Sequence, residues 1–185
     1  MGGTFDPPHI AHLLAGESAY RDLDLDIVHF VPAGAPWQKA DQPVTSSDHR
    51  LLMTELATSG VGYFIADDRE VTRQGWSYTA DTLAEFDADD ELYLIVGADT
   101  AAGMLSWDRI SEVLGQSQIA VAPRLGTDRR AVEETGIPCI WLDMPVVGIS
   151  ATDVRDRAEA GKSYRFLVRP NVFRYIEEKK LYSAT

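Results

Sequence analysis

The sequence has little cysteine, few positive charges and no long apolar run. Its 185 residues include a single cysteine, Cys139, which excludes an intramolecular disulfide and a cysteine-rich zinc site. No stretch approaches the roughly 20 apolar residues of a membrane span, and no charged-then-apolar signal peptide begins the chain. Lysine and arginine total 17 against 29 acidic residues, and this net charge of −12 argues against extended nucleic-acid binding. We therefore expect a cytoplasmic, soluble protein that binds neither membranes nor nucleic acids.

Apolar runs alternate with helical patterns along most of the chain. The length and a hydrophobic fraction of 45% suit a single domain, residues 1–185, with its own core. Runs bounded by glycine or proline predict buried parallel strands at 27–31, 92–96, 119–122 and 139–142, with a weaker candidate at 64–72. The helices expected between them cover 10–21, 48–58, 79–86, 108–114 and 129–134. This alternation predicts a three-layer α/β/α sandwich around a doubly wound, mostly parallel sheet.

The two ends of the chain depart from this alternation. Helical patterns at 150–160 and 170–180 predict a small C-terminal helical part, about 150–185. At the other end only Met1 precedes the first glycines, although a doubly wound sheet needs a central strand there. We expect this strand to be truncated at Met1, because a sheet without its middle would leave unpaired backbone groups on two neighbours.

One motif near the start carries most of the functional information: Gly2-Gly3-Thr4-Phe5-Asp6-Pro7-Pro8-His9-Ile10-Ala11-His12. The two glycines allow a tight turn and a close approach of the backbone to a ligand. His9 and His12 stand three residues apart where a helix can begin, so both rings can share one face of its first turn. Because a helix N-terminus favours anions, the motif predicts a pocket for a polyphosphate. Taken alone, the histidine pair could instead cap the helix or form half of a metal site.

Two loops after predicted strands offer further ligand contacts, since such sheets bind ligands beyond the carboxyl ends of their strands. The proline-rich segment 32–39 ends in Lys39, a flexible cation for phosphate or, equally on the sequence alone, a solvated lysine. Gly97-Ala98-Asp99 ends the strongest apolar run, and Trp107 follows it. Asp99 can accept from sugar hydroxyls, and Trp107 can stack on an aromatic ring, although a tryptophan is by default a core residue.

Three predicted helix starts also carry polar groups. Ser77-Tyr78-Thr79-Ala80-Asp81-Thr82-Leu83 supplies hydroxyls and N–H groups that suit a carboxylate. Ile149-Ser150-Ala151-Thr152-Asp153-Val154-Arg155 places a guanidinium about one turn beyond a capped helix start, a second anion site. Ser46 or Ser47 can cap the helix at 48–58, where His49 and Arg50 are second-tier candidates. Each stretch alone is also typical of an ordinary capped surface helix.

Together these stretches resemble the HxGH nucleotidyltransferases, and specifically the bacterial nicotinate-mononucleotide adenylyltransferases. The resemblance extends through Arg73 and Gly75 before the serine-tyrosine-threonine stretch and through a P-x-x-V-x-x-Y-I…L-Y ending at 170–182, so it covers essentially the whole chain. It implies a Rossmann-like nucleotidyltransferase fold. The site residues that it implies are, for catalysis, His9, His12, Lys39 and Arg155; for ATP, Gly2, Gly3, Thr4, Phe5, Ser150 and Thr152; and for nicotinate mononucleotide, Tyr78, Thr79, Gly97, Asp99 and Trp107.

The resemblance also implies a reaction in NAD biosynthesis: ATP and nicotinate mononucleotide give deamido-NAD and pyrophosphate by direct in-line attack on the α-phosphorus. Mg²⁺ is expected to be held mainly by the ATP phosphates and water, with no metal site made of protein ligands. The sequence leaves a homo-oligomer open. It departs from the HxGH pattern at Ala11, which replaces the glycine and brings a methyl group close to the nucleotide.

Other functions stay open on the sequence alone. The same fold could adenylylate nicotinamide mononucleotide or phosphopantetheine, although the stretch 77–83 and Trp107 speak against both. A nucleotide-sensing module without catalysis gains some weight from Ala11 and the short first strand. A metal-binding module built on His9 and His12 lacks a third ligand at a regular spacing.

Overall fold

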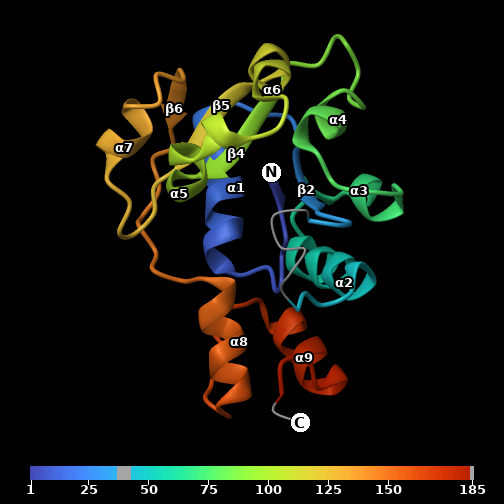
Figure 1. Cartoon of the computed structure of the whole chain (residues 1–185). Helices are drawn as coiled ribbons and strands as arrows, with labels where there is room; N and C mark the ends of the chain where they lie inside the picture. Colours follow the sequence, from blue (N-terminus) through green and yellow to red (C-terminus); the bar gives the residue numbers. More distant parts are fainter. Residues whose placement is uncertain (37–42, 184–185) are drawn as a thin grey trace.

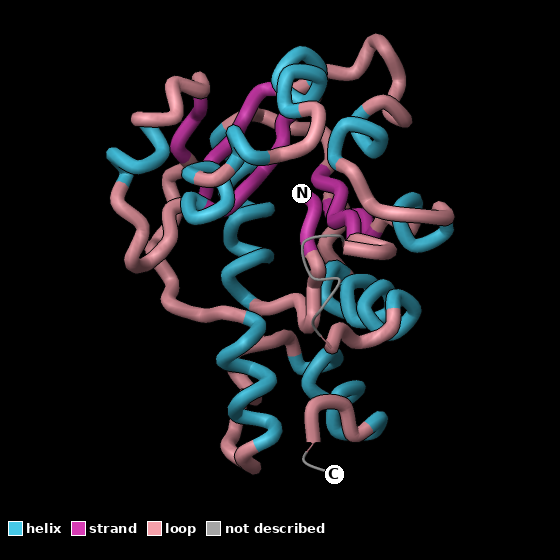
Figure 2. The backbone as a smooth tube through the Cα atoms, viewed as in Figure 1, coloured by secondary structure: helices cyan, strands magenta, loops and turns pink. Residues whose placement is uncertain are grey.

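The computed structural model describes residues 1–36 and 43–183, in which short parallel strands alternate with helices (Figure 1, Figure 2). The strands are β1 (Gly2–Gly3), β2 (Val28–Pro32), β3 (Phe64–Ala66), β4 (Tyr93–Gly97), β5 (Gln118–Ala122) and β6 (Cys139–Trp141). The helices are α1 (Ile10–Asp22), α2 (Ser47–Thr58), α3 (Arg69–Thr72), α4 (Thr79–Leu83), α5 (Ala98–Ala102), the 3-10 turn η2 (Met104–Ser106), α6 (Ile110–Gln116), α7 (Arg129–Glu133), α8 (Ala151–Glu159) and α9 (Pro170–Lys179).

The strands follow the order of a doubly wound fold. β1 pairs with β2 and β2 with β3, while β4, β5 and β6 pair in sequence, all of them parallel. β1 lies against β4, so the spatial order is 3-2-1 followed by 4-5-6. Because β1 spans only two residues and no ladder joins it to β4 within the described ranges, the strands form two three-stranded sheets side by side. The expected α/β sandwich is confirmed, with this division at its centre.

Both faces of the strands are covered by helices, as the near-continuous apolar runs predicted. Leu94 and Val96 of β4 point into a core shared with α4, α5, α6 and α7, while Ile95 between them points into the core beneath α1. Alternate residues of a strand face opposite sides, so a strand buried on both faces must be apolar throughout. Figure 1 shows α1 beside the strands and α4 to α7 gathered around β4, β5 and β6.

A third core lies between α2 and the two C-terminal helices. Met53 and Ala57 of α2 pack with Val154 of α8 and with Val172 and Ile176 of α9. The predicted helices at 150–160 and 170–180 are confirmed as α8 and α9, and Figure 1 shows both at the end of the molecule where α2 lies. This packing brings the C-terminal part against the start of the chain.

The strand expected over 64–72 is wrong beyond Ala66. The Asp67 carboxylate accepts the backbone N–H of Arg69 at 3.1 Å, an Asx-type turn that ends β3 and starts α3. The helix expected over 79–86 is also shorter, because α4 ends at Leu83. The other predicted elements are present to within about two residues, the usual uncertainty of an element boundary.

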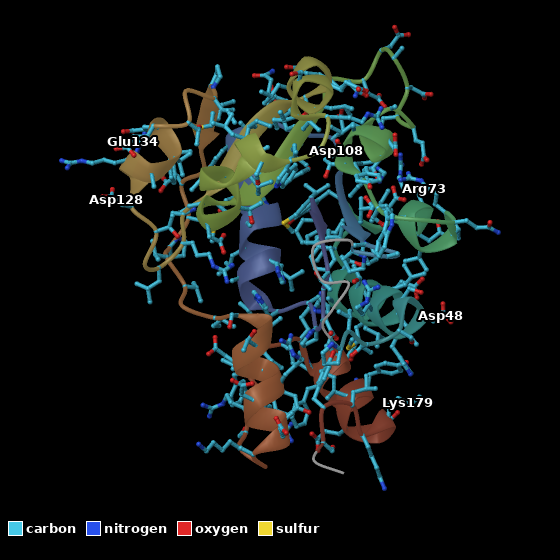
Figure 3. The ribbon with its side chains drawn as sticks, in the orientation of Figure 1. Asp48, Arg73, Asp108, Asp128, Glu134 and Lys179 are labelled. Atoms are coloured by element: carbon cyan, nitrogen blue, oxygen red, sulfur yellow. The ribbon has the colours of Figure 1, made fainter. Side chains whose placement is uncertain are left out.

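The outer surface is charged. Figure 3 shows side chains such as Asp48, Asp128, Glu134 and Lys179 at the periphery of the ribbon. In the described part of the chain, none of the helices combines the length and the apolar character that crossing a bilayer would require.

Candidate functional site

A cavity of about 570 Å³ extends from the carboxyl ends of β1, β2, β4 and β5 along β4 to the residues that precede β2 and β4, a size that suits a small organic ligand. Its lining includes residues of the turn after β1, the start of α1, the start of α4, and the segments after β4 and β5. Of the residues expected at the site, it brings together Gly2, Gly3, Thr4, His9, His12, Tyr78, Thr79, Gly97, Asp99 and Trp107. Segments far apart in the sequence therefore meet at one place, as the strand order requires.

The two histidines of the first motif form a stacked pair at the start of α1. His9 is the N-cap residue, and its ring lies 3.7 Å from that of His12 at 22° between the planes. The backbone N–H of His9 donates to Nδ1 of His12 at 3.1 Å. Because Nδ1 accepts this bond, a neutral His12 carries its proton on Nε2. The pair thus shares one helix face, and Nε2 of His12 is a hydrogen-bond donor.

Burial keeps His9 neutral at physiological pH. The residue is 3% exposed, and its Nδ1 has no hydrogen-bond partner among the described residues. Burial, followed by the positive charge of Arg124, lowers the pKa of His9 from 6.5 to about 4, and Asp153 opposes the shift. His9 is therefore a neutral polar group that is already shielded from water before any ligand binds.

This lowered pKa predicts an acid-dependent loss of stability. The unfolded chain binds a proton on His9 near pH 6.5, and the folded protein only near pH 4, so stability is lost as pH falls through that window. Between pH 7.5 and pH 4.5 this one group contributes about 2–3 kcal/mol to the loss. Urea unfolding at both pH values checks it: the decrease is expected to be smaller in His9→Gln by that amount. Equal decreases in the two proteins would contradict the assignment.

The turn after β1 presents unpaired N–H groups. Within the described residues, the backbone N–H groups of Thr4, Phe5 and Asp6 have no hydrogen-bond acceptor. Phe5 itself is buried at 2% exposure, and its ring packs edge-on against His12, with the centroids 5.0 Å apart. Successive free N–H groups beside a helix N-terminus form a concave anion site.

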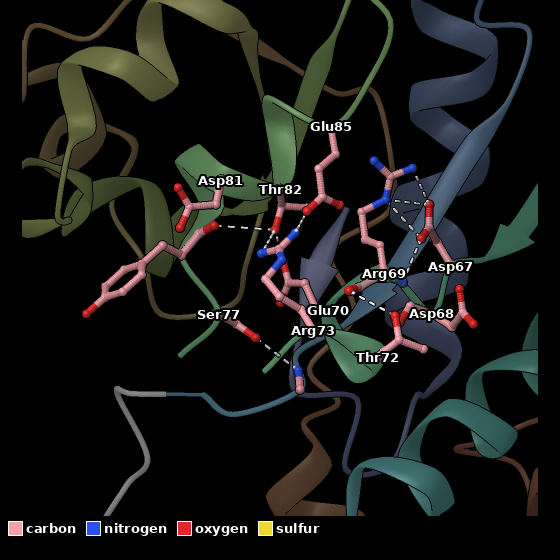
Figure 4. A network of polar contacts seen from close by, with 12 residues as sticks. Asp67, Asp68, Arg69, Glu70, Thr72, Arg73, Ser77, Asp81, Thr82 and Glu85 are labelled. Atoms are coloured by element: carbon pink, nitrogen blue, oxygen red, sulfur yellow. Dashed lines mark hydrogen bonds and ion pairs between the residues drawn. The ribbon is translucent and has the colours of Figure 1, made fainter. Parts of the chain in front are cut away.

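The start of α4 is fixed by a polar network (Figure 4). The Thr82 hydroxyl donates to Glu70 at 2.6 Å and accepts from Arg73 at 3.2 Å, while Arg73 also pairs with Glu85 at 2.6 Å. Burial raises the pKa of Glu70, whose carboxylate contacts Thr82. Nearby, Ser77 accepts the backbone N–H of Gly34 at 3.0 Å. This network holds the segment that carries Tyr78 and Thr79 into the cavity.

A cation that the sequence analysis missed enters the cavity after β5. Arg124 forms an ion pair with Asp99 at 3.1 Å, and both residues line the cavity. Trp107 packs half-buried against the core under α4 to α7 and lines the same wall. A signal for Arg124 existed: like Gly97 and Asp99, it follows the carboxyl end of an apolar run. The paired Asp99 carboxylate offsets part of its charge.

The remaining expected residues that the structure describes lie around this cavity without lining it: Phe5, Ser150, Thr152 and Arg155. Arg155 donates from Nη1 to the carbonyl of Asp6 at 2.7 Å and from Nη2 to the Thr152 hydroxyl at 3.2 Å. It therefore contacts the turn after β1 (Thr4 to Asp6, the phosphate turn) without lining the cavity. Ser150 caps α8 together with Asp153, whose carboxylate accepts from the Ser150 N–H at 2.8 Å. Phe5 is buried beneath the turn, and Lys39 lies outside the described residues.

The carboxylates near the cavity already have partners. Asp6 accepts from the Thr45 N–H at 3.2 Å and from the Tyr182 hydroxyl at 2.6 Å, and Asp99 pairs with Arg124. Over residues 1–36 and 43–183 there is no cluster of three or more histidine, cysteine, aspartate or glutamate residues placed to hold a metal ion. A divalent cation here suits ligands brought by a phosphorylated substrate better than a protein cage.

Comparisons with known proteins agree with this geometry. A family model described as cytidylyltransferase-like matches residues 1–157. A protein named "Probable nicotinate-nucleotide adenylyltransferase" from Thermoanaerobacter sp. (strain X514) is 37% identical over 194 residues, covering 98% of this chain and 92% of its own length. One of the same name from Geobacillus thermodenitrificans (strain NG80-2) is 39% identical over 187 residues, covering 100% and 85%.

A solved structure shares the fold at lower identity. Plasmodium falciparum nicotinic acid mononucleotide adenylyltransferase complexed with NaAD superposes with a TM-score of 0.82 at 18% identity, covering 98% of this chain and 94% of that one. At this identity the superposition speaks to the fold alone.

Proposed function

This chain belongs to the cytidylyltransferase-like family and, within it, to the nicotinate-nucleotide adenylyltransferases, and from that membership we propose that it joins ATP to nicotinate mononucleotide in NAD biosynthesis in the cytoplasm. An oxygen of the mononucleotide phosphate forms a bond to the α-phosphorus of ATP. The bond from the α-phosphorus to the bridging oxygen breaks, and pyrophosphate leaves with the electron pair. The products are nicotinate adenine dinucleotide and pyrophosphate.

One observation carries this proposal: a single cavity joins a phosphate-binding end to an end suited to a pyridine acid. At the first end lie the stacked histidines and the N–H groups of the turn after β1 that have no acceptor among the described residues. At the other lie the start of α4 with Tyr78 and Thr79, and the half-buried ring of Trp107. A helix start favours the nicotinate carboxylate and an indole face favours its ring, which supports the acid rather than a phosphopantetheine arm.

In the mechanism we propose, the protein positions and neutralises charge, with no covalent intermediate. Thr4 and its neighbours hold phosphate oxygens through backbone N–H groups, and the imidazoles of His9 and His12 donate hydrogen bonds to the β- and γ-phosphates. Arg124 and Arg155 supply positive charge from two sides, and Lys39 is a further candidate. Mg²⁺ bound to the ATP phosphates would lower the charge on the leaving pyrophosphate.

The test is pyrophosphate release with ATP and Mg²⁺, comparing nicotinate mononucleotide, nicotinamide mononucleotide and phosphopantetheine. We expect the highest kcat/KM with the acid. Faster release with the amide would overturn the assigned substrate and leave adenylyl transfer intact. Absence of release with all three would favour a nucleotide-sensing module.

Ala11 offers a milder prediction. Its methyl group lines the cavity on the first turn of α1, where family members carry glycine. We expect Ala11→Gly to leave kcat unchanged or raise it and to lower KM for ATP, because the nucleotide gains room beside the helix. Steady-state kinetics check this. A large loss of activity would show that this helix face does not meet the nucleotide.

A further inference from the structure

Arg50 connects three loop segments by hydrogen bonds, and one of them is the phosphate turn. It lies in the first turn of α2 and is 1% exposed. Its guanidinium donates to three backbone carbonyls: Thr4 at 2.9 Å, Gly34 at 3.0 Å and Thr45 at 2.8 Å. Burying a cation is costly unless its donors are satisfied, and the forked guanidinium bonds each carbonyl through a different nitrogen, Nε, Nη1 or Nη2. The arrangement therefore fixes the relative positions of these segments.

The contact with Thr4 sets the orientation of one peptide group. In a planar trans peptide the C=O and the N–H point in opposite directions. Thr4 lines the cavity and Arg50 does not, so the carbonyl held by Arg50 is turned away from the cavity. The N–H of Phe5, on the other side of the same peptide, is turned toward it. This N–H is one of the unpaired donors of the turn.

That orientation is strained at Phe5. Its φ is 49°, in the left-handed region that a residue with a side chain rarely adopts. Rotating the peptide between Thr4 and Phe5 by half a turn would bring this φ into the favourable extended region. The same rotation would present the Thr4 carbonyl oxygen to the cavity, where its partial negative charge would repel a phosphate. An outside contact must therefore hold the peptide.

We infer that Arg50 is a positioning residue, which holds the peptide between Thr4 and Phe5 with its N–H toward the phosphates of ATP. The carbonyls of Gly34 and Thr45 fix the guanidinium, and the guanidinium fixes Thr4. Gly34 also donates to the Ser77 hydroxyl, so the same anchor touches the segment before α4. The inference rests on the proposed function for the identity of its ligand, ATP. It adds to that function the residue that orients the peptide between Thr4 and Phe5.

The test compares Arg50→Met and Arg50→Lys with a matched control, Arg169→Met. Arg169 also donates to backbone carbonyls of α2 and its C-cap, Ala57 at 3.1 Å and Ser59 at 2.8 Å, at the end of the helix away from the cavity. The measurements are kcat, KM for each substrate, the Kd for ATP by calorimetry, and Tm. All activity is measured well below the lowest Tm.

We expect Arg50→Met to lower kcat/KM for ATP about tenfold or more and to raise the Kd for ATP, since a bond to a charged donor is lost. The KM for nicotinate mononucleotide is expected to change less. Arg50→Lys keeps the charge but has one nitrogen, so its loss is expected to be smaller. Arg169→Met is expected to lower Tm and to leave kcat/KM for ATP within about twofold.

Equal kcat/KM and Kd for ATP in Arg50→Met and Arg169→Met would overturn the inference. Should Arg50→Met not fold, Arg50→Lys decides: an ATP Kd within about twofold of the unaltered protein would overturn it. The Kd for ATP separates this inference from the proposed function. If the protein binds ATP through Arg50 but releases no pyrophosphate, the proposed function fails and the inference stands.

Discussion

Replacing His12 by alanine is expected to lower kcat/KM by about 10²–10³, the usual effect of losing one donor to transition-state charge. Nδ1 of His12 accepts the N–H of His9, so the donor that we expect to meet the phosphates is the Nε2 N–H. The two nitrogens can be tested separately. Asparagine can keep an acceptor at the Nδ1 position and loses the distal donor, while glutamine keeps an amide donor near Nε2. We therefore expect His12→Gln to retain more activity than His12→Asn in steady-state pyrophosphate release.

His49→Asn provides the matched control for this series. His49 lies in α2, where its ring contacts the Tyr175 hydroxyl at 2.5 Å, and it does not line the cavity. Its substitution is expected to leave kcat/KM within about twofold of the unaltered protein. Activity in His12→Asn equal to that in His12→Gln would show that the distal nitrogen of His12 does not meet the reacting phosphates.

Gly34→Ala is expected to destabilise the fold by at least about 3 kcal/mol, because overpacking against backbone cannot be relieved by a side-chain rotation. A Cβ at this position would lie 1.9 Å from the backbone oxygen of Glu70 in α3. Gly34 cannot move away freely, because its N–H is bonded to Ser77 and its carbonyl to Arg50. Urea unfolding measures the loss, and the site is expected to be disturbed with it.

Gly62→Ala is the control for this substitution, since a Cβ there meets nothing within 4 Å and Gly62 has no left-handed φ. Its free energy of unfolding is expected to change by less than about 1 kcal/mol. If Gly34→Ala were as stable as Gly62→Ala, α3 could not pack on the end of β2 as closely as described.

The sequence predicted best where one local signal determines the structure. Apolar runs bounded by glycine or proline placed β4 and β5, and Ser46 was a correct choice for the cap of α2, since it accepts from the His49 N–H. The segment after Ala66 belonged to the weaker strand prediction over 64–72, which has an acidic middle. The Asp67 side chain instead competes for the backbone and turns the chain into α3.

The contacts that the sequence did not predict join residues that are far apart in the chain. Arg50 was only a second-tier candidate, because nothing local reveals that its guanidinium meets carbonyls 46 and 16 residues away in the chain. Arg124 has a local signal, its position after an apolar run, but its ion pair with Asp99 joins two different strand ends and is visible only in the structure. Tyr182 belongs to the C-terminal motif that only supported the resemblance, yet its hydroxyl donates to Asp6 in the phosphate turn.

The bond between Tyr182 and Asp6 has a consequence for the order of events during synthesis. The two residues are separated by 176 positions, so the ribosome makes the phosphate turn long before the tyrosine that bonds to it. N-terminal segments generally fold earlier during translation, whereas the bond to Asp6 comes from the segment that follows α8 and α9. A nascent chain can therefore form the strands and α1 early, while the phosphate turn gains its bond from Tyr182 only after α9 and that tyrosine have emerged.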